Sequence, residues 1–202
     1  MRLIQTLYPE YFCDDKIVFK SCGKIWIVVL EKLDTTRTTE KRNVHDKKYA
    51  KFRGDKFKVL NIINKIDPSV TINTVENSIF KDKTIKYVKN EIIETEFDDD
   101  LNNVCSKGIH YYVSIEPAFS LEFDMFILDN KVSVGRYNLN EKMTEYDEDG
   151  NISCIYNLKN GFIDGKLQCF DGGKLIKEIT YNEGTLQGKC IFYDKHGNIL
   201  RE

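Results

Sequence analysis

Cys105 and His110 are the residues whose types could do chemistry most directly, because a thiol beside an imidazole can form a nucleophile and base pair. Such a pair requires the two side chains to face one another and a third group to orient the base, and the sequence offers no evident third group. The spacing favours the alternative, in which Cys105 fills the core and His110 binds a backbone carbonyl at a strand edge. The two residues belong to one run, Cys105-Ser106-Lys107-Gly108-Ile109-His110-Tyr111-Tyr112.

The six cysteines stand at positions 13, 22, 105, 154, 169 and 190. None of them forms a C-x-x-C pair, and only three histidines accompany them, so the pattern does not predict a zinc site or any other cofactor. Scattered cysteines without a secretory signal are typical of reduced thiols. We expect most of them to be small core residues.

Charge is nearly balanced over the whole chain and uneven along it. The net charge of −2 predicts no bulk attraction to nucleic acid or to a membrane. Residues 41–58 hold eight Lys or Arg against Asp46 and Asp55, and residues 91–100 hold six acids and no base. Such clusters are typical of solvated faces or loops; the alternative is a docking patch in which one segment neutralises the other.

Composition indicates a folded, soluble protein. Hydrophobic residues make up 41% of the 202 residues and charged residues 31%, which is the usual balance for a globular domain. The longest apolar stretch, Ile25–Leu30, is far shorter than the roughly 20 residues that span a bilayer. Pro9 and Glu10 follow the first apolar residues, so no signal-peptide core forms. We therefore expect an intracellular protein that is neither secreted nor transmembrane.

The elements that must position these residues are mostly strands. Residues 16–31 form two β-branched and aromatic runs around a turn with Gly23, which predicts a β-hairpin. Its second arm is apolar on both faces, so we expect a central, fully covered strand. Further strands are predicted at 57–66, where helical spacing competes with β-branched residues, and in three shorter segments. These segments are 79–80, 85–88 and 108–113.

Two other segments complete the first part of the chain. Residues 35–51 hold few apolar side chains and should be a loop or an exposed, weakly ordered stretch. Pro117 suits the first position of a short helix, expected over 117–121. Residues 1–125 thus form a β-rich α+β domain, residues 126–145 a connecting segment, and residues 146–202 a third, repetitive region.

The repetition is the most specific pattern in the sequence. Gly161, Gly165 and Lys166 recur as Gly184, Gly188 and Lys189, each 23 positions later; Gly150 recurs as Gly173, and again as Gly197 after a further 24. Apolar and polar residues alternate between the glycines. The pattern predicts β-hairpins that pair edge to edge into one antiparallel sheet. Gly150, Gly173 and Gly197 should adopt positive φ at the turns. One face should carry Ile152, Tyr156, Leu175, Ile179 and Phe192.

This unit resembles the MORN-repeat variant, which also occurs in bacterial antitoxin-like proteins and in large DNA viruses. The resemblance covers residues 146–202 and implies an all-β meander that serves as a spacer or a protein-binding surface. Lipid binding is claimed for some longer arrays, but residues 143–202 hold seven basic against ten acidic residues, which disfavours binding to anionic lipid.

A second resemblance concerns the earlier motif. Arg53, Lys56 and Val59, together with the run from Cys105 to Tyr112, are similar to an uncharacterised domain of large DNA viruses. That pattern tends to have Cys or a second basic residue before Arg53, where this chain has Phe52, so no metal role follows. The Gly108-Ile109-His110-Tyr111 segment also resembles, faintly, one of ADP-ribosyltransferases, with Arg53 and Glu122 as their partner residues.

These observations predict a non-enzymatic protein-binding or assembly component. The resemblances imply a virion-associated or capsid-associated protein of a large DNA virus, located in the virion or in the host cytoplasm. Its expected partners are capsid or other structural proteins, or a host protein, and neither nucleic acid, a membrane nor a small-molecule substrate is expected. The alternative is an accessory factor that acts on a host protein by sequestration or by an ADP-ribosyltransferase-like activity.

Overall fold

The structure, a computed structural model, divides the chain into two units. The first comprises Met1–Leu121 with Glu148–Gly150, and the second comprises Glu122–Asp147 with Asn151–Glu202. None of the helices in the described ranges has the length and apolar character needed to cross a bilayer. The structure describes residues 2–23, 25–79, 83–119, 126–128, 131–133 and 140–201.

The predicted N-terminal hairpin is confirmed. β1 (Ile17–Cys22) pairs antiparallel with β2 (Trp26–Lys32), from Ile17 opposite Glu31 to Cys22 opposite Trp26. Gly23, with φ of 55°, lies in the connection, where a residue without Cβ adopts this conformation at least cost.

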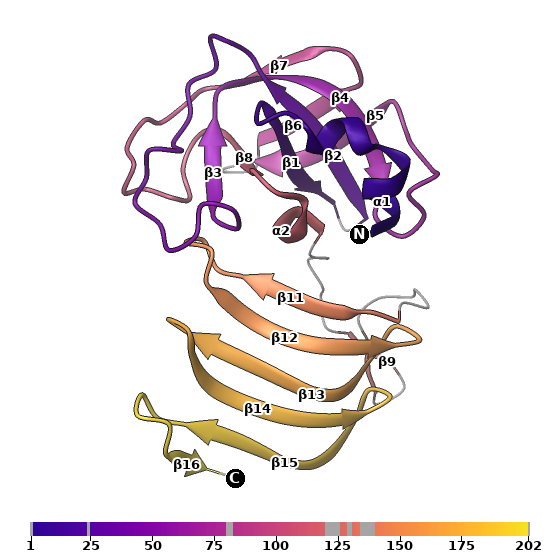
Figure 1. Ribbon diagram of the computed structural model, residues 1–202, viewed down its shortest axis with the longest axis vertical. Coiled ribbons are helices and arrows are strands. Elements are labelled where there is room, and N and C mark those ends of the chain that lie inside the picture. The colour runs from indigo at the N-terminus through magenta and orange to yellow at the C-terminus, as the bar shows by residue number, and fades with distance from the viewer. Residues whose placement is uncertain are drawn as a thin grey trace. The chain divides into compact units, whose positions relative to one another are not determined.

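The hairpin forms the centre of a six-stranded antiparallel sheet (Figure 1). β2 lies between β1 and β4, and residues 27–30 of β2 are fully buried, which confirms the prediction of a covered central strand. The strand predicted at 57–66 is observed as β4, which ends at Asn64, two residues earlier than predicted. The sheet order is β3 (Lys51–Gly54), β8 (Ile109–Tyr112), β1, β2, β4 (Lys56–Asn64), β7 (Ile92–Glu94).

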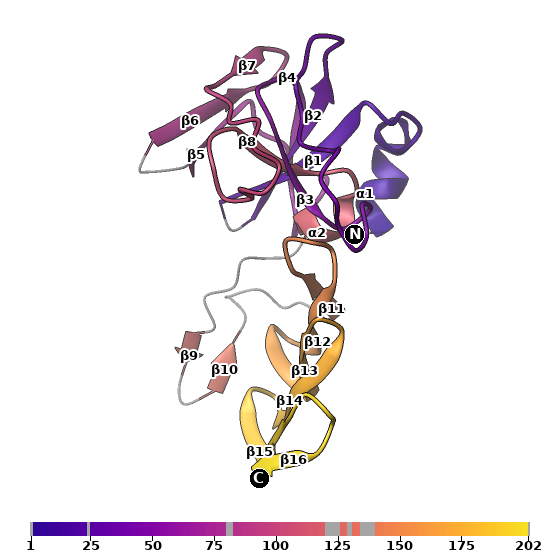
Figure 2. The same ribbon diagram turned by 90° about the vertical axis from the view of Figure 1, so that its left-hand side faces the viewer.

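Because side chains alternate along a strand, each face of this sheet has its own core. Ile27 and Val29 pack with α1 (Arg2–Leu7) and α2 (Ile115–Phe119) through Ile4 and Ile115, and the 3₁₀ helix η1 (Pro9–Phe12) adds Tyr11 and Phe12. Val28 and Leu30 pack on the opposite side with Tyr87. That residue belongs to the two-stranded sheet of β5 (Thr74–Ile79) and β6 (Lys83–Val88), which lies across the six-stranded sheet from α1 (Figure 2).

Two expectations for the first unit can be refined. Residues 35–50 form the predicted loop, but this loop is not simply exposed, because Thr39, Arg42 and Ala50 are buried. The short helix begins at Ile115 and not at Pro117, which lies at its third position. Of the expected strand 79–80, Phe80 lies outside the described residues, as do residues 120–121 of the expected helix.

In the second unit, six strands pair with their sequence neighbours in one antiparallel meander (Figure 1). This sheet begins at Lys142, inside the segment expected to connect the domains, which also contains β9 (Phe126–Leu128) and β10 (Lys131–Ser133). β9 and β10 form a hairpin on one side of the sheet (Figure 2), joined to it at Ser133 opposite Phe162. The strands are β11 (Lys142–Tyr146), β12 (Ile152–Lys159), β13 (Phe162–Asp171), β14 (Lys174–Asn182), β15 (Thr185–Tyr193) and β16 (Ile199–Arg201).

The glycines of the repeat behave as the period predicts. Gly150, Gly173 and Gly197 have φ of 86°, 78° and 87°, which confirms positive φ at these turns. At the opposite turns two consecutive residues have positive φ, Asn160 with Gly161 and Glu183 with Gly184. Two such residues are typical of a type I′ hairpin, whose twist matches that of the strands it joins.

Gly165 and Gly188 have a different role, because they lie inside β13 and β15 with φ of 79° and 91°. The register shifts where the neighbouring strands pass them, between Ile155 and Asn157 and between Ile179 and Tyr181. A glycine with positive φ at a bulge bends its strand and increases the local twist. Gly165 and Gly188 therefore curve the sheet.

The repeat sheet has a small core on one face, which brings together Met143, Tyr156, Leu158, Ile163, Leu167 and Ile179. Of the five residues predicted for this face, Tyr156 and Ile179 are buried. Leu175 and Phe192 are half-buried, and Ile152 is exposed. Among these five residues, burial falls towards the turns that contain Gly150, Gly173 and Gly197, which the alternation of residue types could not indicate.

Candidate functional site

The two motif segments of the first unit lie side by side as β3 and β8. Arg53 pairs with His110, and Phe52 with Tyr111, although more than fifty residues separate them. The sequence patterns marked both segments but did not predict that they pair. The register places the arginine and the histidine on neighbouring strands, so their surroundings must be described together.

Arg53 is buried and fully engaged with the loop before β8. Its guanidinium donates to the carbonyls of Asp100, at 2.8 Å, and Lys107, at 3.1 Å, and lies 3.8 Å from the carboxylate of Asp98. Asp98 in turn accepts a hydrogen bond from Ser106. An arginine can organise a loop in this way because it offers five donors in a fixed fork. The arrangement gives Arg53 a structural role, and Glu122, its suggested partner in a transferase, lies outside the described residues.

His110 and Cys105 each bind a group other than one another. Nε2 of His110 lies 3.1 Å from the carbonyl oxygen of Val104, which agrees with the predicted contact to a backbone carbonyl, although β8 lies between β3 and β1 and not at an edge of the sheet. Burial, and then the charges of Lys51 and Lys20, lower the pKa of His110 to about 4. The imidazole is therefore neutral at pH 7.

Cys105 does not fill the core, as the sequence suggested, but is exposed. Its Sγ donates to Oε1 of Glu148 at 2.8 Å, and this hydrogen bond, with burial, raises the pKa of the thiol. A protonated thiol is a poor nucleophile. Cys105 and His110 thus do not form a nucleophile and base in this arrangement.

The remaining motif residues have structural surroundings. Lys56, at the start of β4, forms an ion pair with Glu94 at 3.0 Å. Gly108 has φ of 133°, and a Cβ there would approach Cβ of Arg53 to 3.2 Å. Ile109 and Tyr111 are fully buried, and the hydroxyl of Tyr111 donates to Glu40 at 2.8 Å.

The basic and acidic segments partly neutralise each other. Lys56 with Glu94 and Arg53 with Asp98 both join residues 41–58 to residues 91–100. Neutralisation of one segment by the other was part of the docking-patch alternative, and the docking patch itself stays a prediction. Within the described part of the chain, no three His, Cys, Asp or Glu side chains come together as candidate metal ligands.

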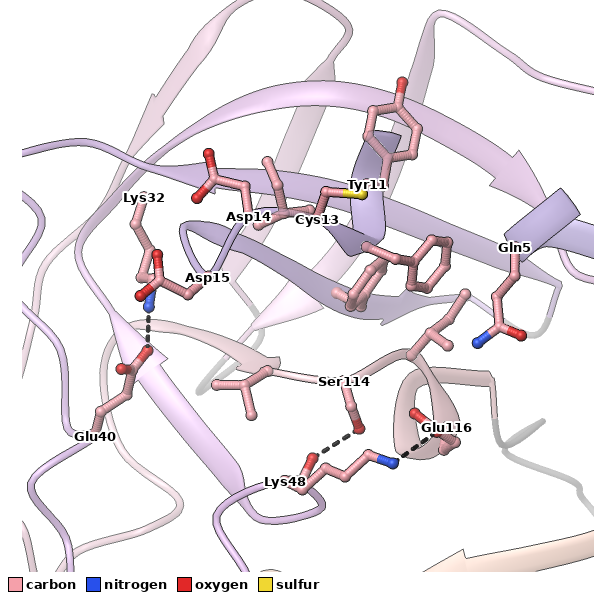
Figure 3. Close-up of a pocket in the computed structure, with 15 residues that line it drawn as sticks. Gln5, Tyr11, Cys13, Asp14, Asp15, Lys32, Glu40, Lys48, Ser114 and Glu116 are labelled. Atoms are coloured by element: carbon pink, nitrogen blue, oxygen red, sulfur yellow. Dashed lines mark hydrogen bonds and ion pairs between the residues drawn. The ribbon is translucent and has the colours of Figure 1, made fainter. Parts of the chain in front are cut away.

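A pocket of about 590 Å³ in the first unit was not predicted (Figure 3). Its lining comes from α1, η1, β1, β2, the loop after β2 and the start of α2, segments that only the fold assembles. Tyr11, Phe12 and Phe19 supply its aromatic part. No sequence pattern links these segments, so the sequence could not predict the pocket.

Two ion pairs define the polar part of this pocket (Figure 3). Lys32 binds Glu40 at 2.9 Å, and Lys48 binds Glu116 at 3.1 Å. The hydroxyl of Ser114 donates to the carbonyl oxygen of Lys48 at 2.7 Å. Asp14 and Asp15 add two further carboxylates. Since both lysines already bind glutamates, the lining disfavours an anionic ligand such as a phosphate.

The C-terminal end of the repeat sheet exposes apolar side chains. Leu186 is 56% exposed, Ile199 54% and Leu200 68%, and Ile176 is also exposed. β16 pairs with only Phe192 and Tyr193 of β15. We call these four exposed residues, Ile176, Leu186, Ile199 and Leu200, the open end of the repeat sheet.

A comparison with known protein families finds a match for most of the first unit. Residues 6–118 match a family of unknown function, DUF5758. The chain belongs to this family. The matched region contains Arg53, Lys56 and the run from Cys105 to Tyr111, so the paired strands β3 and β8 are features of the DUF5758 region. The repeat strands from β11 onwards lie beyond it. No curated protein and no solved structure matches the chain.

Proposed function

We propose that this chain is a non-enzymatic protein-binding or assembly component that contacts its partner through the open end of the repeat sheet. The observation that carries the proposal is the exposure of Leu186, Ile199 and Leu200 on β15 and β16, the last two strands of the sheet. Exposed apolar side chains at the end of a sheet are typical of a surface that another protein covers.

The exposed side chains suit a partner with an apolar surface of its own. Leu186 on β15 and Ile199 and Leu200 on β16 supply the apolar contacts. The repeats resemble MORN-variant units, and the use of such units as protein-binding surfaces supports this proposal.

Within the proposal, the partner is a structural protein of a large DNA virus, and the chain is part of the virion. The ground is the resemblance of both regions to sequences from such viruses. The geometry around Arg53, Cys105 and His110 agrees with a chain that binds and does not catalyse, because each of these side chains is engaged in a structural contact.

Quantitative mass spectrometry of purified virus particles tests this proposal. A copy number in fixed ratio to the major structural proteins supports it. Absence from the particle contradicts it and favours the alternative, a factor that acts on a host protein.

A pair of variants tests the surface. Leu186→Ser should abolish incorporation into particles without unfolding the chain, because Leu186 is already 56% exposed. Ile92→Ser is the matched control, since Ile92 is 60% exposed but lies in β7 of the first unit. Equal incorporation of both variants would rule out the open end of the repeat sheet as the contact surface.

A further inference from the structure

Two cysteines of the repeat sheet face each other across neighbouring strands. Cys154 of β12 is the direct register partner of Cys169 of β13, and their Sγ atoms are 3.2 Å apart. Both thiols are free and partly buried. The 15-residue separation in the sequence gave no sign of this contact, which depends on the hairpin register.

We propose that Cys154 and Cys169 form a reversible disulfide, and that this pair is an oxidation site for small disulfides such as glutathione disulfide. Directly opposed residues of an antiparallel pair have Cβ atoms about 4.5–5.5 Å apart, and a disulfide requires about 3.5–4.5 Å. The sulfurs need to approach by only about 1 Å to reach the bonding distance of about 2.05 Å. Small adjustments of the side chains and strands therefore suffice.

The surroundings of the pair distinguish its two thiols. Cys154 donates its S–H to Cys169, and Lys177, the register partner of Cys169 on β14, adds a positive charge. Both effects lower the pKa of Cys169, against burial and the charge of Glu145. The hydrogen bond to Cys169, burial and Glu145 raise the pKa of Cys154. Cys169 is thus the thiolate that attacks first, and Cys154 is the resolving thiol.

The chemistry proceeds by two exchanges. The Cys169 thiolate attacks one sulfur of glutathione disulfide, which breaks its S–S bond and releases one glutathione thiolate. Cys154 then gives its proton to solvent and attacks Sγ of Cys169, which forms the new disulfide and releases the second glutathione thiolate. Two cysteine thiols are oxidised by two electrons, and one glutathione disulfide is reduced.

The other cysteines lack such a partner position. Cys13 and Cys105 are exposed, Cys22 is buried, and Cys190 lies opposite Ile179. We expect Cys13 and Cys105 to give at most mixed disulfides with glutathione. An intramolecular link should be specific to Cys154 and Cys169.

The test uses the full chain under native conditions. It is incubated with glutathione disulfide, the remaining thiols are alkylated, and tryptic peptides are mapped by mass spectrometry. Lys159 and Lys166 lie between the two cysteines, so trypsin separates them and a linked peptide is diagnostic. We expect the 154–169 link, with loss of two alkylatable thiols and return of both on treatment with a reductant. A native chain that gives only mixed disulfides, or another link, overturns the proposal.

Three variants resolve the order of steps. Cys154→Ser should accumulate a glutathione adduct on Cys169, because the resolving thiol is absent. Cys169→Ser should react more slowly and form no link, and Cys190→Ser should form the link as the native chain does. If Cys154→Ser leaves Cys169 without an adduct while the native chain forms the link, Cys169 is not the first nucleophile and that assignment is wrong. The mapping on the native chain does not depend on how any variant folds.

Discussion

In the first unit, β2 is covered on both faces, and residues 27–30 have no exposed surface. In the second unit, the largest sheet buries a core of six side chains on one face, and the turns and bulges are set by glycines with positive φ. The first sheet therefore depends mainly on side-chain packing, whereas the second depends to a larger extent on backbone conformation. Replacing the same type of residue should therefore change the free energy of unfolding by different amounts in the two units.

Truncation of a core leucine tests the contrast most strongly. Leu30→Ala should reduce the free energy of unfolding of the first unit by about 2–5 kcal/mol, because it leaves a cavity in a fully packed core. Leu175→Ala, at a half-buried position of β14, should cost about 1 kcal/mol. Urea unfolding followed by fluorescence of Trp26, the single tryptophan, reports on the first unit, and hydrogen exchange reports on the second. Equal losses would contradict the contrast.

Equivalent glycines of the repeat should differ in the stability that is lost when each is replaced by alanine. Gly150→Ala places a Cβ against the carbonyl oxygen of Asp46 and adds left-handed strain, so we expect a loss of about 2–4 kcal/mol. Gly173 has φ of 78° but open space around it, so Gly173→Ala should cost only about 1–2 kcal/mol. Hydrogen exchange and denaturant unfolding measure both losses. A larger loss at Gly173 would show that the turn conformations are misassigned.

Acid should change the contributions of His110, in the first unit, and of Glu145, in the second, in opposite directions. The pKa of His110 is about 4 in the fold against 6.5 when unfolded, so the unfolded chain binds more protons as pH falls. The first unit should lose at most about 3 kcal/mol between pH 6.5 and 4. Burial raises the pKa of Glu145 in the second unit, so its protonation in acid favours that fold. Trp26 fluorescence over this range checks the first unit, and His110→Gln should flatten its profile.

The smallest effect is expected at the type I′ turn that contains Glu183. Its φ of 46° is unfavourable for a residue with a Cβ, so Glu183→Gly should stabilise the second unit by about 0.5–1 kcal/mol. Glu183→Ala keeps the Cβ and loses only an exposed ion pair with Lys159, so it should change stability by less than about 0.5 kcal/mol. Thermal unfolding followed by circular dichroism distinguishes the variants. Destabilisation by glycine would contradict the turn assignment.

Local patterns in the sequence determined the strands and the turns. The apolar run of residues 25–30 predicted a covered central strand, and the 23-residue period predicted positive φ at Gly150, Gly173 and Gly197. Both predictions depend only on residues that are neighbours in the sequence. An unbroken apolar run indicates a strand that is buried on both faces, and a glycine adopts positive φ at little cost. The sequence also predicted that His110 binds a backbone carbonyl, and its Nε2 lies 3.1 Å from the oxygen of Val104.

Tertiary structure alone decided which distant residues meet. The pairing of Arg53 with His110, the pocket of Figure 3 and the 3.2 Å contact of Cys154 with Cys169 all depend on strand order and register. The prediction that Cys105 fills the core was wrong for the same reason, because its hydrogen bond to Glu148 joins residues 43 positions apart. Register is a property of a pair of strands, set by packing and by bulges such as those opposite Gly165 and Gly188, and no single strand's sequence contains it.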